Sequence, residues 1–173
     1  MAYSAIAVAN AFIERAKKQN ITDLTPMKLQ KLVFFAHAWS LAASNNPLIK
    51  DKVLAWRYGP VIESVYHEFK SYGSNNITKP GTELIWSDDP DDIVKAKFSA
   101  PMIPKSDDYA NSIIDVVLDV YGDKSAVFLS NLTHEKGSAW DVTKEHHHDG
   151  SSKGYVIPNS IIQETTKKEL GVE

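Results

Sequence analysis

The stretch TPMKLQKLVFFAHAWSLAAS, residues 25–44, decides the fold of this 173-residue chain. Thr25 is a good helix N-cap, and Pro26 stands at the first helical position, where a proline sacrifices no hydrogen bond. Apolar residues cover most faces of the expected helix: Leu29, Leu32, Val33, Phe34, Phe35, Ala36, Trp39, Leu41 and Ala43. A helix that is apolar nearly all round is buried, so we expect it to be the central helix of a domain.

Helical patterns flank this stretch on both sides. Ser4 can cap a helix over residues 4–19, in which many of the apolar residues are small. Gly59 permits a turn and Pro60 suits a first helical position, so another helix is expected to begin there. Apolar faces at helical spacing predict the remaining helices over residues 61–72, 106–121, 125–134 and 159–170.

Strands are expected in two places only. The β-branched and aromatic content of residues 53–58 favours a short strand, and a strand pair is possible at 83–100. Prolines recur at 80, 90, 101 and 104, and no hydrophobic period survives between them. The sequence therefore predicts a mostly α fold: a single compact helical domain over residues 1–173, with a small β element and a variable proline-rich insertion at about 74–105.

The composition narrows the possible functions. The chain carries 19 basic and 22 acidic residues and only two arginines, which is unlike a nucleic-acid-binding protein. It has no cysteine, so disulfides, thiolate metal sites and cysteine nucleophiles are excluded. No apolar run approaches the ~20 residues of a membrane helix, and the N-terminus lacks the basic start of a signal peptide. We expect a cytoplasmic protein.

The stretch AWRYGPVIESVYHEFKSYG, residues 55–73, allows two interpretations. A helix N-terminus after Gly59-Pro60 could bind an anion together with Arg57. Alternatively, the Gly-Pro step only shapes the chain, with Trp56 and Tyr58 packing on the helix that follows. Phosphate-binding loops usually contain more glycines, which favours the second interpretation.

The histidines are the remaining candidates for chemistry. Glu63 and His67 stand four residues apart, as an acid–base pair or a plain surface pair would. His146, His147 and His148 could bind a metal weakly, but a solvated loop is the expected interpretation. His37 lies inside the central helix and is expected to be a hydrogen-bonded core residue. No common nucleophile, phosphate-loop or zinc-protease motif occurs in the chain.

Three stretches in order resemble a known family. They are TPMKLQKLVFFAHAWSLA, then VLAWRYGPVIESVYHEFKSYG, and then LSNLTHEKGSAW with a final IPNSII. Together they resemble the Panacea domain, the SocA-like antitoxin family that is also described among phage-associated proteins. The resemblance covers residues from about 4 to about 164, and the pairing of K-L-Q-K-L with A-W-x-Y-G-P-V is its most specific part.

The resemblance implies a bacterial antitoxin of a toxin–antitoxin system, which binds and neutralises a cognate toxin by protein–protein interaction. It implies no enzymatic activity and no cofactor. A SocA-like member can also act as an adaptor that delivers its toxin to a protease. Many members carry a DNA-binding domain before the Panacea domain; this chain begins almost at the first Panacea helix, so autoregulation by DNA binding is not expected.

The residues divide into two expected roles. A structural motif is expected to consist of Trp39, Trp56, Tyr58, Gly59, Pro60, Phe69, His134 and Trp140. Partner binding is expected at Arg57, Tyr66, His67 and Lys70, because tyrosine and arginine are frequent interface anchors, and at an acidic loop that could meet a basic toxin, Asp88, Asp89, Asp91 and Asp92. Two alternatives stay open: a phage or mobile-element accessory protein without a toxin partner, and a hydrolase that uses His67 or His134.

Overall fold

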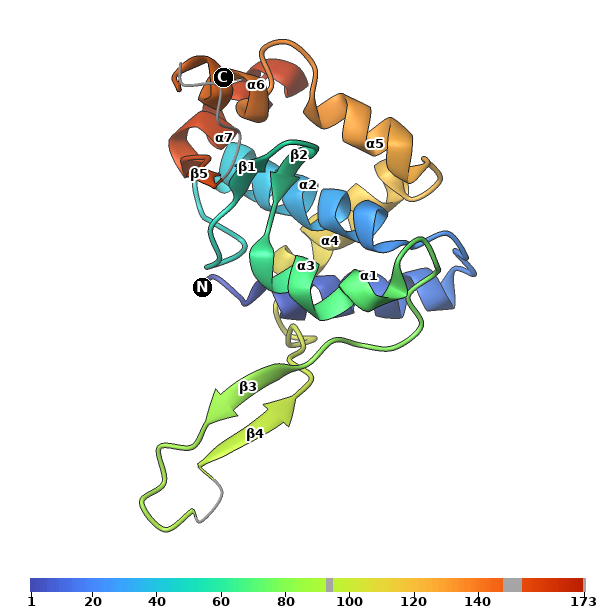
Figure 1. Ribbon diagram of the computed structural model, residues 1–173, viewed down its shortest axis with the longest axis vertical. Helices are drawn as coiled ribbons and strands as arrows, with labels where there is room; N and C mark the ends of the chain where they lie inside the picture. Colours follow the sequence, from blue (N-terminus) through green and yellow to red (C-terminus); the bar gives the residue numbers. More distant parts are fainter. Residues whose placement is uncertain (93–94, 148–153, 173) are drawn as a thin grey trace.

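Helix α2 (Pro26–Ser44) is the centre of the molecule, and the other helices surround it. The computed structural model describes residues 1–92, 95–147 and 154–172 (Figure 1). In these residues α2 contacts the helices α1 (Ala5–Lys18), α3 (Glu63–Phe69), α4 (Asp108–Tyr121), α5 (Ala126–Thr133) and α7 (Asn159–Leu170). The mostly α fold expected from the sequence is therefore confirmed, and so is the central place of residues 25–44.

The ends of α2 form as its sequence predicts. The hydroxyl of Thr25 accepts a hydrogen bond from the Lys28 backbone N–H at 3.3 Å, and Pro26 occupies the first turn. Asn45 ends the helix in the left-handed conformation, with φ of 60°. Asparagine tolerates that conformation better than most residues because its short side chain can hydrogen-bond locally.

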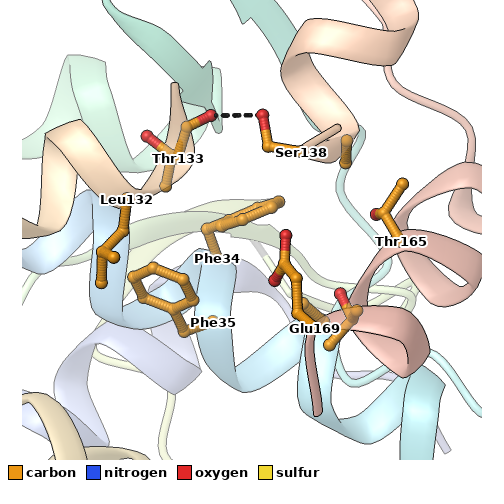
Figure 2. A pocket seen from close by; sticks show the side chains of 10 residues that line it. Phe34, Phe35, Leu132, Thr133, Ser138, Thr165 and Glu169 are labelled. Atoms are coloured by element: carbon orange, nitrogen blue, oxygen red, sulfur yellow. Dashed lines mark hydrogen bonds between the residues drawn. The ribbon is translucent and has the colours of Figure 1, made fainter. Parts of the chain in front are cut away.

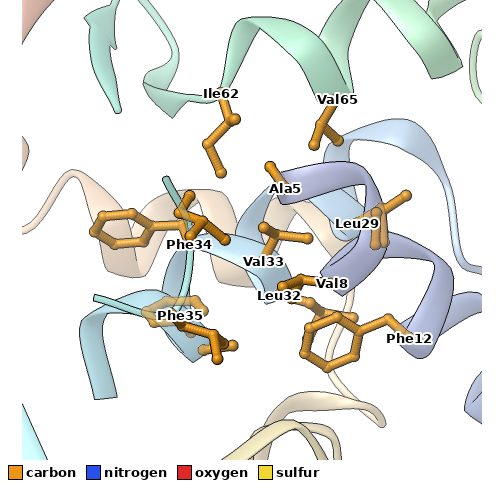
Figure 3. Close-up of a cluster of buried hydrophobic side chains, with 14 of the residues drawn as sticks. Ala5, Val8, Phe12, Leu29, Leu32, Val33, Phe34, Phe35, Ile62 and Val65 are labelled. Carbon is orange, nitrogen blue, oxygen red and sulfur yellow. The ribbon is translucent and has the colours of Figure 1, made fainter. Parts of the chain in front are cut away.

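One part of the core lies between α1, α2 and α3 (Figure 3), and the same cluster continues into α4, α5 and α7. Phe12, Leu29, Leu32, Val33 and Ile62 all have 0% exposure. Burying a side chain of this size contributes about 1.5–3 kcal/mol, so these contacts account for much of the stability. The small residues of α1 let the two helix backbones approach closely.

His37 is completely buried inside α2, as expected of a core histidine. The backbone N–H of Ile49 donates to its Nδ1 at 3.4 Å, so Nε2 carries the proton and donates to Asn159 Oδ1 at 3.0 Å. Burial lowers the pKa of His37, and the Asn159 contact opposes this only in part. The ring therefore joins α2 to the start of α7 in its neutral form.

A three-stranded sheet covers one end of α2. It has the order β2–β1–β5, with β1 (Leu54–Trp56), β2 (Gly59–Val61) and β5 (Tyr155–Val156) all antiparallel to their neighbours. The expected helix start at Gly59-Pro60 is wrong, because these residues form strand β2 and α3 begins at Glu63.

The side chain of Gln30 explains why the chain stays extended as far as Ile62. Its amide donates to the Ile62 carbonyl at 2.9 Å, and its oxygen accepts from the Ile62 N–H at 3.1 Å. Gln30 thus pairs with Ile62 as a neighbouring strand would. After α3 the chain continues as the 3₁₀ turn η1 (Lys70–Tyr72).

Helix α6 (Ala139–Glu145) was not expected from the sequence. Its N-cap is Ser138, whose hydroxyl accepts from the Asp141 N–H at 3.3 Å, while Asp141 Oδ2 accepts from the Gly137 N–H at 2.9 Å. Ser138 followed three residues later by Asp141 resembles the capping-box signal for a helix start. That signal could have predicted α6 from the sequence.

The strand pair expected at 83–100 is present. Strand β3 (Glu83–Trp86) pairs antiparallel with β4 (Ala96–Ser99), and the two project together from the helical body (Figure 1). We call residues 82–100 the arm. The arm projects from the body beside α1 and α3 at one end of the long axis, whereas the β1–β2–β5 sheet lies within the helical body, farther along that axis (Figure 1).

Candidate partner-binding surface

The side chain of Lys31 links α2 to the β1–β2 hairpin. It is 2% exposed, and its ammonium donates to the backbone carbonyls of Tyr58 and Pro60, each at 3.2 Å. Burial lowers the pKa of Lys31 from 10.5 to about 8. The ammonium thus holds the hairpin in place through neutral dipoles.

Gly59 is the point at which three segments come together. Its φ is +106°, a conformation that side chains rarely adopt. A Cβ atom here would lie 2.7 Å from Lys31 Nζ and 3.0 Å from both His134 Cε1 and Thr133 Oγ1. Glycine is therefore required for the close approach of α2, β2 and the end of α5.

Two tryptophans and a histidine complete this centre. The indole N–H of Trp140 donates to the Trp56 carbonyl at 2.7 Å, which ties α6 to β1. The rings of His134 and Trp140 meet edge to face, 4.4 Å apart. Lys31, Trp56, Gly59, His134 and Trp140 come from three separate sequence blocks, and the fold brings them into one cluster, which we call the motif centre.

The polar groups of the motif centre make structural hydrogen bonds. His134 Nδ1 lies 2.6 Å from the Ser130 carbonyl oxygen, which can only accept, so Nδ1 carries the proton. The Thr133 hydroxyl donates to the same carbonyl at 2.7 Å. The hydroxyl proton of Thr133 is thus directed at a carbonyl and not at an imidazole, unlike the nucleophile–base pair of a hydrolase.

An open groove lies above the motif centre. It has a volume of about 780 Å³, and its lining includes Met27, Trp56, Tyr58, Val61 and Tyr66. Trp56 and Tyr66 meet edge to face with ring centroids 5.0 Å apart. The exposed fractions of Met27, Tyr58 and Tyr66 are 46%, 70% and 40%, so large apolar surfaces are open on its walls. The groove could not be predicted from the sequence, because its walls come from separate elements, chiefly α2, β1, β2 and α3.

The structure brings together some of the residues predicted to bind a partner. Arg57 and Tyr66 both line the groove, and the Arg57 guanidinium lies over the Tyr58 ring, 5.5 Å from its centroid. The ring of His67 contacts Tyr66 edge to face at 5.3 Å. Lys70 is exposed one turn further along the chain, in η1.

The four acidic candidates lie elsewhere. Asp88, Asp89, Asp91 and Asp92 form the turn of the arm, where Asp89 Oδ1 accepts from the Asp91 N–H at 3.0 Å. Because the arm projects away from the body that carries the β1–β2–β5 sheet, these residues do not share the groove (Figure 1). The sequence alone predicted that both groups bind a partner, but it did not show that they lie on separate surfaces.

Among the residues assigned to a structural motif, the side chain of Tyr58 differs from the others. Phe69 is 1% exposed and Pro60 is buried, and Trp39 packs edge to face on Tyr121 with centroids 5.8 Å apart. Tyr58, in contrast, does not pack on α3, because the two-residue turn after β1 directs its ring outward. Its backbone carbonyl, which accepts from Lys31, is its contribution to the fold.

A second, much smaller pocket lies between α2, α5, α6 and α7 (Figure 2). Its volume of about 20 Å³ is enough for a single water molecule. Figure 2 shows the carboxyl group of Glu169 beside Phe34 in this pocket. Burial, and after it the charge of Glu135, raises the pKa of Glu169. The pocket is too small for a metabolite.

Within the described residues, no group of three histidine or acidic side chains could hold a metal ion. His146 ends α6 and His147 stacks on Tyr155, while His148 lies outside the described residues. In the same part of the chain, no helix is long and apolar enough to cross a bilayer.

The buried Lys31 predicts an unusual dependence of stability on pH. Below pH 8 the folded protein holds a desolvated charge, whereas the unfolded chain keeps its proton up to about pH 10.5. The unfolded chain therefore binds more protons between these values, and stability rises with pH. From pH 7 to 9.5 the free energy of unfolding should increase by about 2 kcal/mol more in the wild type than in Lys31→Met. Urea unfolding at both pH values measures this, and parallel profiles would contradict it.

Comparison with known proteins identifies the family to which the residues of the motif centre belong. The family model described as antitoxin SocA-like, Panacea domain, matches residues 29–141, a span that contains the whole motif centre. Antitoxin SocA of Caulobacter vibrioides (strain NA1000 / CB15N) is 31% identical over 136 residues, which cover 79% of this chain and 68% of that protein. No solved structure matches the chain. The chain thus belongs to the SocA-like antitoxin family that is defined by the Panacea domain.

Proposed function

We propose that this protein neutralises a cognate toxin by binding it directly, and that it catalyses no reaction. The observation that carries the proposal is where the family's motif lies: its residues form the motif centre, directly beneath an open aromatic groove. A rigid, hydrogen-bonded cluster beneath an exposed apolar surface is suited to binding another protein. The proposal places the molecule in the cytoplasm, where the translation machinery attacked by many toxins of such systems is found.

The groove is the proposed contact surface for the toxin, with Arg57 and Tyr66 in its lining and His67 and Lys70 further along α3 and η1. Tyrosine and arginine are enriched among the residues that dominate binding energy, and they do so in desolvated, apolar settings. The Trp56–Tyr66 contact keeps these rings in place before binding, which lowers the entropy lost on association. A toxin side chain or short segment of apolar character fits the groove.

The aspartates at the turn of the arm have a separate proposed role. Charges at the rim of an interface change the rate of association more than the final affinity. Asp88, Asp89, Asp91 and Asp92 would attract a basic toxin before contact, and this attraction would weaken as salt screens it. We also propose that residues 1–173 act as one Panacea-like domain, in which about 74–105 form a variable insertion.

Three other functions can be compared with this proposal: a hydrolase, an adaptor to a protease and a phage accessory protein. A hydrolase that uses His134 is disfavoured, because the neighbouring Thr133 hydroxyl donates to the Ser130 carbonyl and not to the imidazole. Delivery of the toxin to a protease would use the same bound complex, so it extends the proposal. A phage accessory protein without a toxin would differ only in its partner.

The test of the proposed function uses the reading frame beside the gene for this chain. We expect its product to be lethal when expressed alone and harmless when co-expressed with this protein, and the two to purify as a complex. Survival of the host without this protein, or death in its presence, would contradict the proposal.

The contact surface is tested by alanine at Arg57, Tyr66, His67 and Lys70 together. The dissociation constant of the complex should rise by about a hundredfold or more, since one interface anchor of this kind contributes about 2 kcal/mol, roughly a thirtyfold change, and the other three residues add to it. Isothermal titration calorimetry measures the change. The matched control is alanine at Glu164 and Lys168, an exposed pair on α7, which should leave binding unchanged. Equal affinity of both variants would exclude the groove.

A further inference from the structure

One face of the arm is entirely apolar. In the antiparallel register Leu84 lies opposite Phe98 and Trp86 lies opposite Ala96. Side chains alternate between the two faces of a strand, so these four share one face. The other face is mixed and carries Glu83, Ile85, Lys97 and Ser99. This pattern is that of a sheet with one face meant for burial.

That apolar face is uncovered. Leu84, Trp86 and Phe98 are 45%, 68% and 75% exposed, and in the described residues the sheet of the arm has only two strands. A lone two-stranded hairpin is marginally stable in water, and it needs something to pack against its apolar face. An exposed cluster of large apolar side chains of this kind marks an interaction site.

The arm is held firmly at its root, so its direction is fixed. The side chain of Asn10 in α1 is 1% exposed; it donates to the carbonyls of Gly81 at 3.0 Å and Pro101 at 2.9 Å, and accepts from the Gly81 N–H at 2.7 Å. Glu68 Oε1 accepts from the Thr82 N–H at 2.7 Å. One buried amide thus clamps both legs of the arm at its root.

The charge of the protein is concentrated on the arm. Residues 83–99 carry five acidic and two basic side chains, a net charge of −3. Without them, 17 of the 19 basic and 17 of the 22 acidic residues remain, so the rest of the chain is balanced. The arm therefore combines an apolar face with the whole excess of negative charge.

We propose that the apolar face of the arm is a second docking surface for the toxin, separate from the groove, and that it fits a partner with an apolar patch bordered by lysine and arginine. This inference depends on the proposed function. Trp86 and Phe98 supply the buried area, and the aspartates of the turn meet the basic border. With contacts on the arm and in the groove, the protein holds the toxin at two separate places.

The charge argues against a second copy of this chain as the occupant. Two arms packed face to face would bring two net charges of −3 together, and like charges across an interface oppose association. A basic partner removes that repulsion and gains attraction instead. Self-association therefore becomes one of the outcomes that the test must detect.

The test compares variants on the two faces of the same hairpin. Trp86→Ser with Phe98→Ser removes the apolar face, and Ile85→Ser is the matched control on the opposite face. The probe is the toxic product of the neighbouring reading frame, with binding measured by calorimetry. We expect the double variant to bind at least a hundredfold more weakly and the control to change by less than threefold. Trp86→Lys alone, which places a positive charge against a basic border, should also weaken binding at least thirtyfold.

The outcomes separate this inference from the proposed function. If wild-type protein neutralises the toxin and both arm variants bind it as tightly as the wild type, the arm is not a docking surface, while the proposed function stands. If the wild type neutralises nothing, the proposed function fails and this inference fails with it. If light scattering shows a wild-type dimer that Trp86→Ser with Phe98→Ser converts to a monomer, a second copy occupies the arm and the inference is overturned. Unchanged far-ultraviolet circular dichroism confirms that each variant has kept its helical body.

Discussion

Replacing Asn10 with alanine should lower the free energy of unfolding by about 3 kcal/mol, as measured by urea unfolding at 25 °C. The change removes three hydrogen bonds that join α1 to Gly81 and Pro101 at the two legs of the arm. Leaving a buried donor or acceptor without a partner costs about 1–3 kcal/mol per group. Water can reach part of the opened root, so we expect the total to stay below the sum of the three.

The Asn10→Ala substitution should also make the arm more mobile. Backbone amides of β3 and β4 should exchange with deuterium markedly faster in Asn10→Ala than in the wild type, because the clamp at the root no longer restrains the hairpin. The control is Lys18→Ala on the same helix, which removes only an exposed pair with Glu14 and should cost less than about 0.5 kcal/mol. A loss below 1 kcal/mol in Asn10→Ala, with unchanged exchange in the arm, would refute the clamp.

Replacing Gly59 with alanine should be similarly damaging, with a loss of about 3 kcal/mol. The backbone at φ of +106° is strained for any side chain, at a cost of about 1–3 kcal/mol. The new methyl group would also press on Lys31 Nζ at 2.7 Å, and on His134 and Thr133 at 3.0 Å. The lysine end can move, but the Thr133 and His134 contacts belong to the packed end of α5.

The motif centre should loosen in this variant before the rest of the core. The Trp140 indole would lose its 2.7 Å bond to the Trp56 carbonyl as the hairpin moves away from α5 and α6, so we expect a red-shifted tryptophan emission under native conditions. Gly137→Ala is the control: φ is also positive there, at 84°, but nothing lies within 4 Å of the added methyl group. Equal losses in both variants would show that only the backbone conformation matters at Gly59.

Local rules predicted the elements whose signals are local. The Ser4 cap of α1 and the Thr25-Pro26 start of α2 follow from residues within one helical turn, and the structure confirms them. The helix expected over 159–170 is present as α7. The burial of His37 followed from its place in a helix that is apolar nearly all round. The resemblance in three separate blocks was enough to identify the family.

The wrong start of α3 has a different origin. Gly59-Pro60 satisfies the local rules for a helix start, but the decisive partners are Gln30 and Lys31, which lie about 30 residues earlier in the chain. Their side chains bind the backbone of residues 58–62 and keep it extended. A contact of that sequence separation has no signature in the segment itself.

The sequence by itself determined a buried central helix and a mostly α domain, because hydrophobic period and capping residues act over a few positions. It also indicated the antitoxin family, through the resemblance of three motif blocks. Only the tertiary structure decided that Arg57 and Tyr66 share a groove while the aspartates stand apart on the arm, and that Leu84, Trp86 and Phe98 lie on one exposed face. The physical reason is that a surface is made of residues distant along the chain. Its members are chosen by how helices and strands pack, which no single segment encodes.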